Sequence, residues 1–144
     1  LDGIVIYRVN ADTASLERHG FAAALRGSGP RHLKFSPDGK FIYLLNELSV
    51  SLSTCSWDAA TGTAVIDGER IPGLAQLYSS PIYAGGRVYF TDRNGVTVVL
   101  KPGPTVDVVA TNALKEGVDA SLVAVGKQLF VRGQKSLFCI ETKE

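Results

Sequence analysis

The sequence predicts an all-β protein. Apolar and polar residues alternate with a period near two along most of the chain, and β-branched and aromatic residues fill the apolar positions, as in half-buried β-strands. Short stretches of Gly, Asn, Asp and Pro, such as SPDGK at 36–40 and DRNG at 92–95, separate the alternating runs and are typical of tight turns. One alanine-rich stretch, GFAAALRG at 20–27, has helix propensity but is too short to predict a stable helix.

Thirteen strands are predicted between these turns. Each is short, and neighbouring strands are close enough in sequence to pair as hairpins. In chain order the predicted strands are Ile4–Val9, Leu16–Ala22, His32–Ser36, Phe41–Glu47, Ser51–Asp58, Val65–Ile71, Ser80–Ala84, Arg87–Asp92, Thr97–Lys101, Val106–Thr111, Ser121–Val125, Gln128–Arg132 and Ser136–Glu141.

An internal repeat indicates how these strands are grouped. The stretches GPRHLKFSPDGKFIYLLNE, YSSPIYAGGRVYFTDRNG and DASLVAVGKQLFVRGQKSLFCIE each run from a short strand through a glycine turn to a stronger aromatic strand. With the strands that follow, the unit spans about 40 residues, the size of a four-stranded propeller blade. The continuously apolar FIYLL at 41–45 is typical of an inner strand covered on both faces. A β-propeller is therefore favoured over a sandwich.

The predicted strands form two N-terminal strands, two full blades and a three-stranded C-terminal piece. About three four-stranded antiparallel blades cannot close a ring, since propellers have at least about four. We therefore expect the ring to be completed by oligomerisation, with a homodimer as the smallest stable species. The chain contains no methionine, so we expect a fragment, a processed chain or an engineered one.

Composition excludes several classes of partner. The formal net charge is +1, which argues against binding nucleic acid or a charged membrane surface. There is no apolar run long enough to span a bilayer and no targeting segment at the start of the chain. Cys55 and Cys139 each lie in an apolar run, so we interpret both as small core residues and expect neither a disulfide nor a zinc site.

Two stretches carry a family resemblance. Residues 1–74, with GPRHLKFSPDGKFIYLLNEL and CSWDAATGTAVIDGERIPGL, resemble the lactonase family of seven-bladed propellers, the 6-phosphogluconolactonase type. Residues 76–144, with SSPIYAGGRVYFTDRNGVTVVLKPG and DASLVAVGKQLFVRGQKSLFCI, resemble PQQ-like (quinoprotein-type) propeller repeats. We interpret the chain as one continuous structural unit of lactonase-like blades (1–74) and PQQ-like blades (75–144), natural or engineered as a chimera.

The lactonase resemblance implies a polar site at one rim. It places Arg31, His32 and Glu47 as catalytic residues if the chain is lactonase-like, and Arg31, His32 and Asn46 as substrate-binding residues. Arginine can hold a phosphate or carboxylate, and histidine or glutamate could activate water for attack on an ester carbonyl. The alternative is that these are ordinary polar residues at a blade rim, because the family builds its pocket from several blades.

The PQQ-like resemblance implies a scaffold without quinone, because the sequence lacks adjacent cysteines and its single tryptophan, Trp57, lies in the other half. We expect no cofactor and no metal, and a packing role for Trp57. Residues 92–94 (Asp-Arg-Asn) are interpreted as turn residues and His19 as solvated. The first functional hypothesis is a structural, self-assembling propeller fragment without catalytic activity. The alternative is a lactone hydrolase, and a protein-binding surface is a third.

Overall fold

The computed structural model describes residues 2–69 and 71–141, and within them it confirms the all-β prediction. All thirteen predicted strands are present there, each within a few residues of its expected bounds. They are β1 (Gly3–Asn10), β2 (Ser15–Ala23), β3 (Pro30–Phe35), β4 (Phe41–Asn46), β5 (Ser51–Asp58), β6 (Thr63–Glu69), β7 (Ile82–Ala84), β8 (Arg87–Thr91), β9 (Val96–Lys101), β10 (Asp107–Ala113), β11 (Val123–Val125), β12 (Gln128–Arg132) and β13 (Leu137–Glu141).

The strands form four sheets in which every hydrogen-bonded neighbour is the next strand in sequence. The sheets are β1-β2, β3-β4-β5-β6, β7-β8-β9-β10 and β11-β12-β13, and all pairings are antiparallel. β3 and β7 each begin a four-stranded sheet, so RHLKFS and SSPIYA lie at equivalent positions, as the repeat predicts. The chain therefore has the grouping of two strands, two full blades and three strands.

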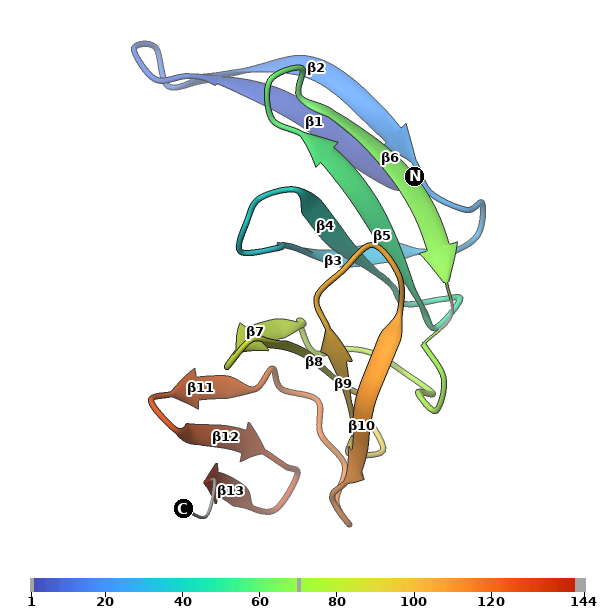
Figure 1. The fold of residues 1–144 in the computed structure, drawn as a ribbon, viewed down its shortest axis with the longest axis vertical. Helices are drawn as coiled ribbons and strands as arrows, with labels where there is room; N and C mark the ends of the chain where they lie inside the picture. Colours follow the sequence, from blue (N-terminus) through green and yellow to red (C-terminus); the bar gives the residue numbers. More distant parts are fainter. Residues whose placement is uncertain (1, 70, 142–144) are drawn as a thin grey trace.

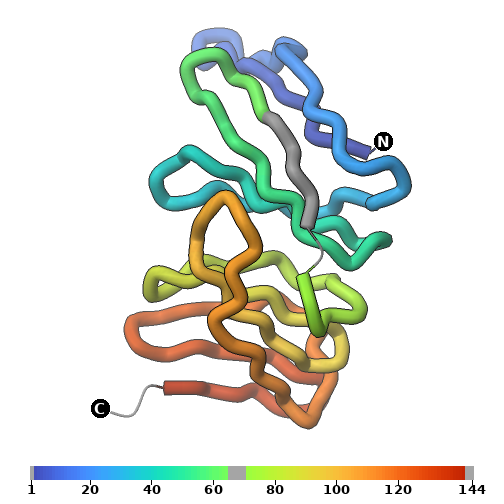
Figure 2. The backbone as a smooth tube through the Cα atoms, turned by 45° about the vertical axis from the view of Figure 1, so that its right-hand side comes forward, coloured from blue at the N-terminus to red at the C-terminus, as the bar shows by residue number. Residues whose placement is uncertain are grey.

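The sheets succeed one another along the long axis of the molecule (Figure 1), and the backbone trace shows the same order of stacked hairpins (Figure 2). Apolar side chains fill the spaces between successive sheets. The largest such cluster joins the second and third sheets and contains Tyr43, Leu45 and Leu52 together with Phe90 and Val98.

Strand β4 is covered on both faces, which explains its unbroken apolar sequence. Tyr43 and Leu45 belong to the cluster shared with the third sheet. The alternate residues Ile42 and Leu44 pack with Cys55 in a second cluster, which Ile4 of the first sheet also joins. Because successive side chains of a strand point to opposite faces, only a strand between two neighbours needs apolar residues at every position.

Some local expectations are corrected. Cys55 is buried as expected, but Cys139 is exposed because β13 belongs to the last sheet, whose outer face is uncovered. GFAAALRG forms no helix, in agreement with the sequence analysis: its first residues continue β2 and the remainder is loop. The strand expected over 65–71 ends at Glu69, and residue 70 lies outside the described residues. Within the described residues there is no helix long and apolar enough to span a membrane.

Candidate functional site

Arg31 and Glu47 form an ion pair at one end of the second sheet. Arg31 lies at an irregularity near the start of β3, where the pairing steps from Pro30–Asn46 to His32–Leu45 and so skips Arg31. Bulges of this kind re-aim side chains. Arg31 Nη1 donates to Glu47 Oε2 at 2.5 Å, and the two side chains are 43% and 27% exposed. Two of the residues that the sequence suggested for a rim site are therefore in contact, and the pair remains accessible to solvent.

His32 lies beside this ion pair and has two neighbours at one ring nitrogen. Its Nε2 is 3.3 Å from Arg31 Nε and 3.2 Å from the carbonyl oxygen of Tyr78. An unprotonated Nε2 can accept from Arg31, whereas a protonated Nε2 can donate only to the carbonyl, so the two bonds are alternatives. The proton on His32 thus decides whether Arg31 Nε is held by the ring.

Asn46 lies apart from the exposed site, although the sequence suggested it as a substrate-binding residue. Its side chain is 1% exposed. Its Nδ2 donates to the hydroxyls of Ser51 and Ser53, at 3.2 and 2.8 Å. In the described residues its Oδ1 has no hydrogen-bond partner. The geometry gives Asn46 a role in joining β4 to β5.

Tyr78, Arg93 and Asp119 extend the polar site toward the last sheet. The guanidinium carbon of Arg31 lies 5.1 Å from the centre of the Tyr78 ring, and that of Arg93 lies 4.5 Å from the same centre. Arg93 Nε donates to Asp119 Oδ1 at 2.6 Å, and this bond raises the pKa of Arg93. Arg31 and Arg93 come from different sheets, so the site crosses a boundary between blades.

Sequence reasoning assigned Arg93 to a turn, and that assignment is correct but incomplete. Asp92, which is 1% exposed, accepts hydrogen bonds from the backbone N–H groups of Asn94 and Val96 within the turn. It also accepts one from Ala75 at 3.0 Å. The turn thereby holds the segment that carries Tyr78. One feature of the sequence pointed to a site role for Arg93: it is a charged residue at the position in the repeat that corresponds to the end of β4.

Two shallow hollows flank the Arg31–Glu47 pair. One, of about 290 Å³, is lined by Glu47, Leu48, Val50, Ala75, Gln76 and Tyr78. The other, of about 220 Å³, lies between β1 and β3 and includes Arg31 and His32. A small ligand could therefore approach the ion pair from either side.

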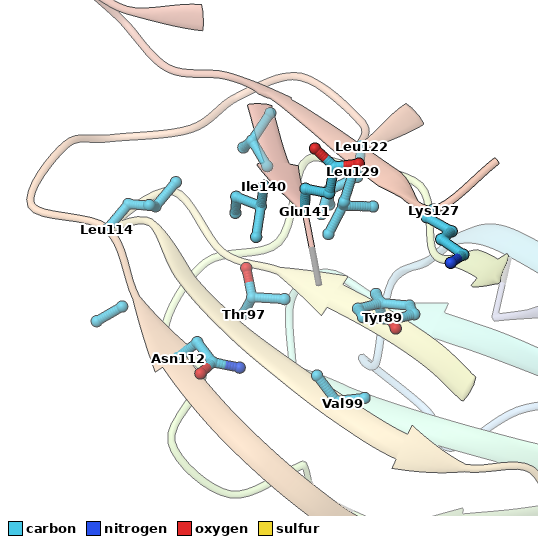
Figure 3. Close-up of a pocket in the computed structure, with 12 residues that line it drawn as sticks. Tyr89, Thr97, Val99, Asn112, Leu114, Leu122, Lys127, Leu129, Ile140 and Glu141 are labelled. Carbon is cyan, nitrogen blue, oxygen red and sulfur yellow. The ribbon is translucent and has the colours of Figure 1, made fainter. Parts of the chain in front are cut away.

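A third hollow, of about 340 Å³, lies between β8–β10 and the last sheet. Tyr89, Thr97 and Val99 face Leu129 and Ile140 across it (Figure 3). Its lining is mainly apolar and includes none of the predicted site residues. Leu122 and Val131, which also line it, belong to the cluster that joins the two sheets. We therefore assign this hollow to packing between sheets.

Several residues outside the site behave as local structural groups. His19 is not simply solvated, because its Nε2 lies 2.7 Å from the carbonyl oxygen of Thr61. Trp57 packs beside the second cluster and meets Phe35 edge to face at 5.8 Å. Among the described residues no group of three His, Cys, Asp or Glu side chains could hold a metal ion.

Comparison with known proteins identifies the family. Residues 1–85 match the family described as "Lactonase, 7-bladed beta-propeller". Because that match covers more than half of the chain, the protein belongs to this family. The match also runs past residue 75, where the sequence suggested a change to PQQ-like repeats. The PQQ-like resemblance, the chimera and the division at that point stay predictions.

Individual known proteins are similar to this chain in sequence or in fold. The 6-phosphogluconolactonase of Pectobacterium carotovorum is 37% identical over 62 residues, which are 42% of this chain and 19% of the relative. A protein from Lactobacillus plantarum has a similar structure, with a TM-score of 0.84 and 20% identity over 99% of this chain and 46% of its own. The structure of the periplasmic gluconolactonase of Pseudomonas aeruginosa is also similar, with a TM-score of 0.81. Its sequence identity is 20%, and the match covers 99% of this chain and 44% of the gluconolactonase. The chain spans less than half the length of each relative.

Proposed function

We propose that the chain provides lactone-hydrolase residues of the 6-phosphogluconolactonase type. The observation that carries this proposal is the solvent-accessible Arg31–Glu47 ion pair beside His32, in a chain of the lactonase family. The family match and the 6-phosphogluconolactonase relatives favour this function over a structural fragment without activity.

The three residues can divide the work of ester hydrolysis. Water adds to the lactone carbonyl, the ring C–O bond breaks, and the ring oxygen takes up a proton to give the open hydroxy acid. Glu47 or His32 accepts the proton that the attacking water loses. Arg31 stabilises the negative charge that develops on the carbonyl oxygen, because its planar guanidinium presents several N–H donors.

The ion pair prepares the arginine for this role. Glu47 Oε2 is engaged by Arg31 Nη1, which fixes the guanidinium before substrate arrives, and such pre-organisation lowers the cost of reaching the transition state. Arg31 also lies over the Tyr78 ring, which supports its flat face. The carboxylate and the ring therefore restrain the guanidinium from two directions.

Hydrolysis of 6-phosphogluconolactone by the 144-residue chain tests the proposal. We expect Glu47→Gln and Arg31→Gln each to lower kcat/KM by about a hundredfold or more, the range of a lost acid–base or oxyanion-stabilising group. Glu17→Gln and Arg87→Gln are matched controls outside the site and should leave the rate unchanged. If both Glu47→Gln and Arg31→Gln hydrolysed the lactone as fast as the wild-type chain, the assignment of these residues would be contradicted.

A further inference from the structure

The ring of Tyr78 joins two cationic positions that come from different sheets. Arg31 lies over it from the start of β3, and Arg93 lies over it from the turn after β8. Both arginine side chains are accessible, with exposed fractions of 43% and 37%. A single aromatic side chain thus links the catalytic end of the site to a second guanidinium.

Arg93 is held so that it can still bind an anion. Its contact with Asp119 is made through Nε, so this bond does not occupy the two Nη groups. Guanidinium groups recognise phosphate and carboxylate through such paired N–H donors. The Tyr78 ring and the Asp119 carboxylate therefore orient Arg93, and the bond to Asp119 uses only the Nε donor.

We propose that Arg93, supported by Tyr78 and Asp119, forms an anion-binding position that receives the phosphate of a phosphorylated sugar lactone. The proposal rests on the proposed function, which places the lactone carbonyl at Arg31 and Glu47. The charged end of the substrate then lies across Tyr78, against the neighbouring sheet. Arg93 is a specificity-determining residue in this arrangement, because it discriminates phosphorylated from unphosphorylated ligands.

A purely structural role for Arg93 makes a different prediction. Backbone hydrogen bonds already tie this turn to its neighbours, since Arg93 N donates to the Gln76 carbonyl and Val118 N donates to the Arg93 carbonyl. These bonds do not depend on the side chain. If the guanidinium served only as a strut to Asp119, its loss would lower stability without changing the preference between ligands.

Calorimetric binding of 6-phosphogluconate and gluconate separates the two roles, and it requires no turnover. We expect the wild-type chain to bind 6-phosphogluconate at least about tenfold more tightly, and Arg93→Gln to remove this difference, as expected for the loss of hydrogen bonds to a charged group. Arg93→Lys retains the charge but not the planar fork, so it should keep part of the preference. Arg87→Gln, at the opposite end of β8, is the matched control.

The outcomes distinguish this inference from the proposed function. An Arg93-dependent preference for the phosphorylated ligand in a chain that hydrolyses no lactone supports the anion site alone. If the chain hydrolyses the lactone and Arg93→Gln still prefers 6-phosphogluconate to gluconate as wild type does, the anion site is overturned and the proposed hydrolase function stands. Equal wild-type affinities for the two ligands also overturn it. Should Arg93→Gln fail to fold, Arg93→Lys decides by the same ratio of affinities.

Discussion

The side chain of Tyr43 bonds to the backbone at Gly103, 60 residues further along the chain and in the neighbouring blade. Gly103 N donates to the Tyr43 hydroxyl at 2.9 Å, and that hydroxyl donates to the Gly103 carbonyl at 3.4 Å. Tyr43 is 3% exposed. The contact therefore joins the second sheet to the loop between β9 and β10.

Tyr43→Phe should destabilise the fold by about 1 kcal/mol, because the Gly103 amide loses its partner in a partly buried setting. Urea unfolding measures the change, and Tyr7→Phe, at a half-exposed side chain of β1, is the control. Equal losses in the two variants would show that the bond to Gly103 contributes nothing.

Alkaline pH should destabilise the fold through the same side chain, because ionisation of Tyr43 is opposed by its burial. Burial raises the pKa of Tyr43 above its ordinary value, so its contribution to stability is present below about pH 10, the unfolded value. This contribution to stability is lost as the pH rises through the higher pKa that Tyr43 has in the folded state. The stability of Tyr43→Phe should fall less over this range than that of wild type, as denaturant midpoints at pH 8 and about pH 11 would reveal.

Two glycines with similar backbones should respond differently to alanine. Gly95 has φ +82°, and a Cβ there would press on the carbonyl of Glu116 and lie 3.1 Å from that of Leu114. Gly39 has φ +68° but open space around the same position. We expect a loss of about 3 kcal/mol for Gly95→Ala and about 1 kcal/mol for Gly39→Ala. Thermal or urea unfolding giving equal losses would refute the steric argument.

Glu116 should make stability depend on acid pH. Its Oε1 accepts hydrogen bonds from the backbone N–H groups of Lys135 and Ser136, and the bond from Lys135 is the main reason that the pKa of Glu116 is lowered. Because the pKa of Glu116 is lower in the folded state, its carboxylate stabilises the fold at pH values above its unfolded pKa, near about 4.3. This stabilisation is lost as the pH falls through the folded pKa.

Glu116→Gln should therefore show a smaller difference in unfolding midpoint between about pH 7 and pH 3 than wild type. Glu17→Gln, on the exposed strand β2, should retain the full difference. If the unfolding midpoint of Glu116→Gln depended on pH as strongly as that of wild type, Glu116 would not be the source of the acid dependence.

The outer faces of the first and last sheets predict self-association. Val9 and Leu16 on the first sheet are 73% and 64% exposed, and Val125 and Leu137 on the last are 58% and 68% exposed. Exposed apolar groups and open sheet edges both favour pairing. We expect native mass spectrometry at micromolar concentration to give a homodimer, and polar substitutions at Leu16 and Leu137 to weaken it. A folded monomer under those conditions would contradict this prediction.

Much of the fold follows from local pattern. Alternation with period two and the intervening turn residues located every strand of the described chain, because a strand's side chains sample opposite faces whatever it packs against. The repeat that begins with GPRHLKF also predicted the four-stranded grouping. Hairpin pairing further brought Arg31 near Glu47, since two short antiparallel strands joined by a tight turn must align their far ends.

Tertiary structure decided which polar residues share one site. Asn46 immediately precedes Glu47 in sequence, but its side chain is buried and bonded to Ser51 and Ser53 of β5, while Glu47 reaches the exposed rim. Arg93 looked like a turn residue, but the segment before β7 packs against its turn and places Tyr78 beside it, and the packing of two sheets brings Arg31 to the same ring. Sequence by itself determines local strands and turns, because these depend on near neighbours. The distance between side chains of separate sheets depends on how whole blades pack, which no local pattern encodes.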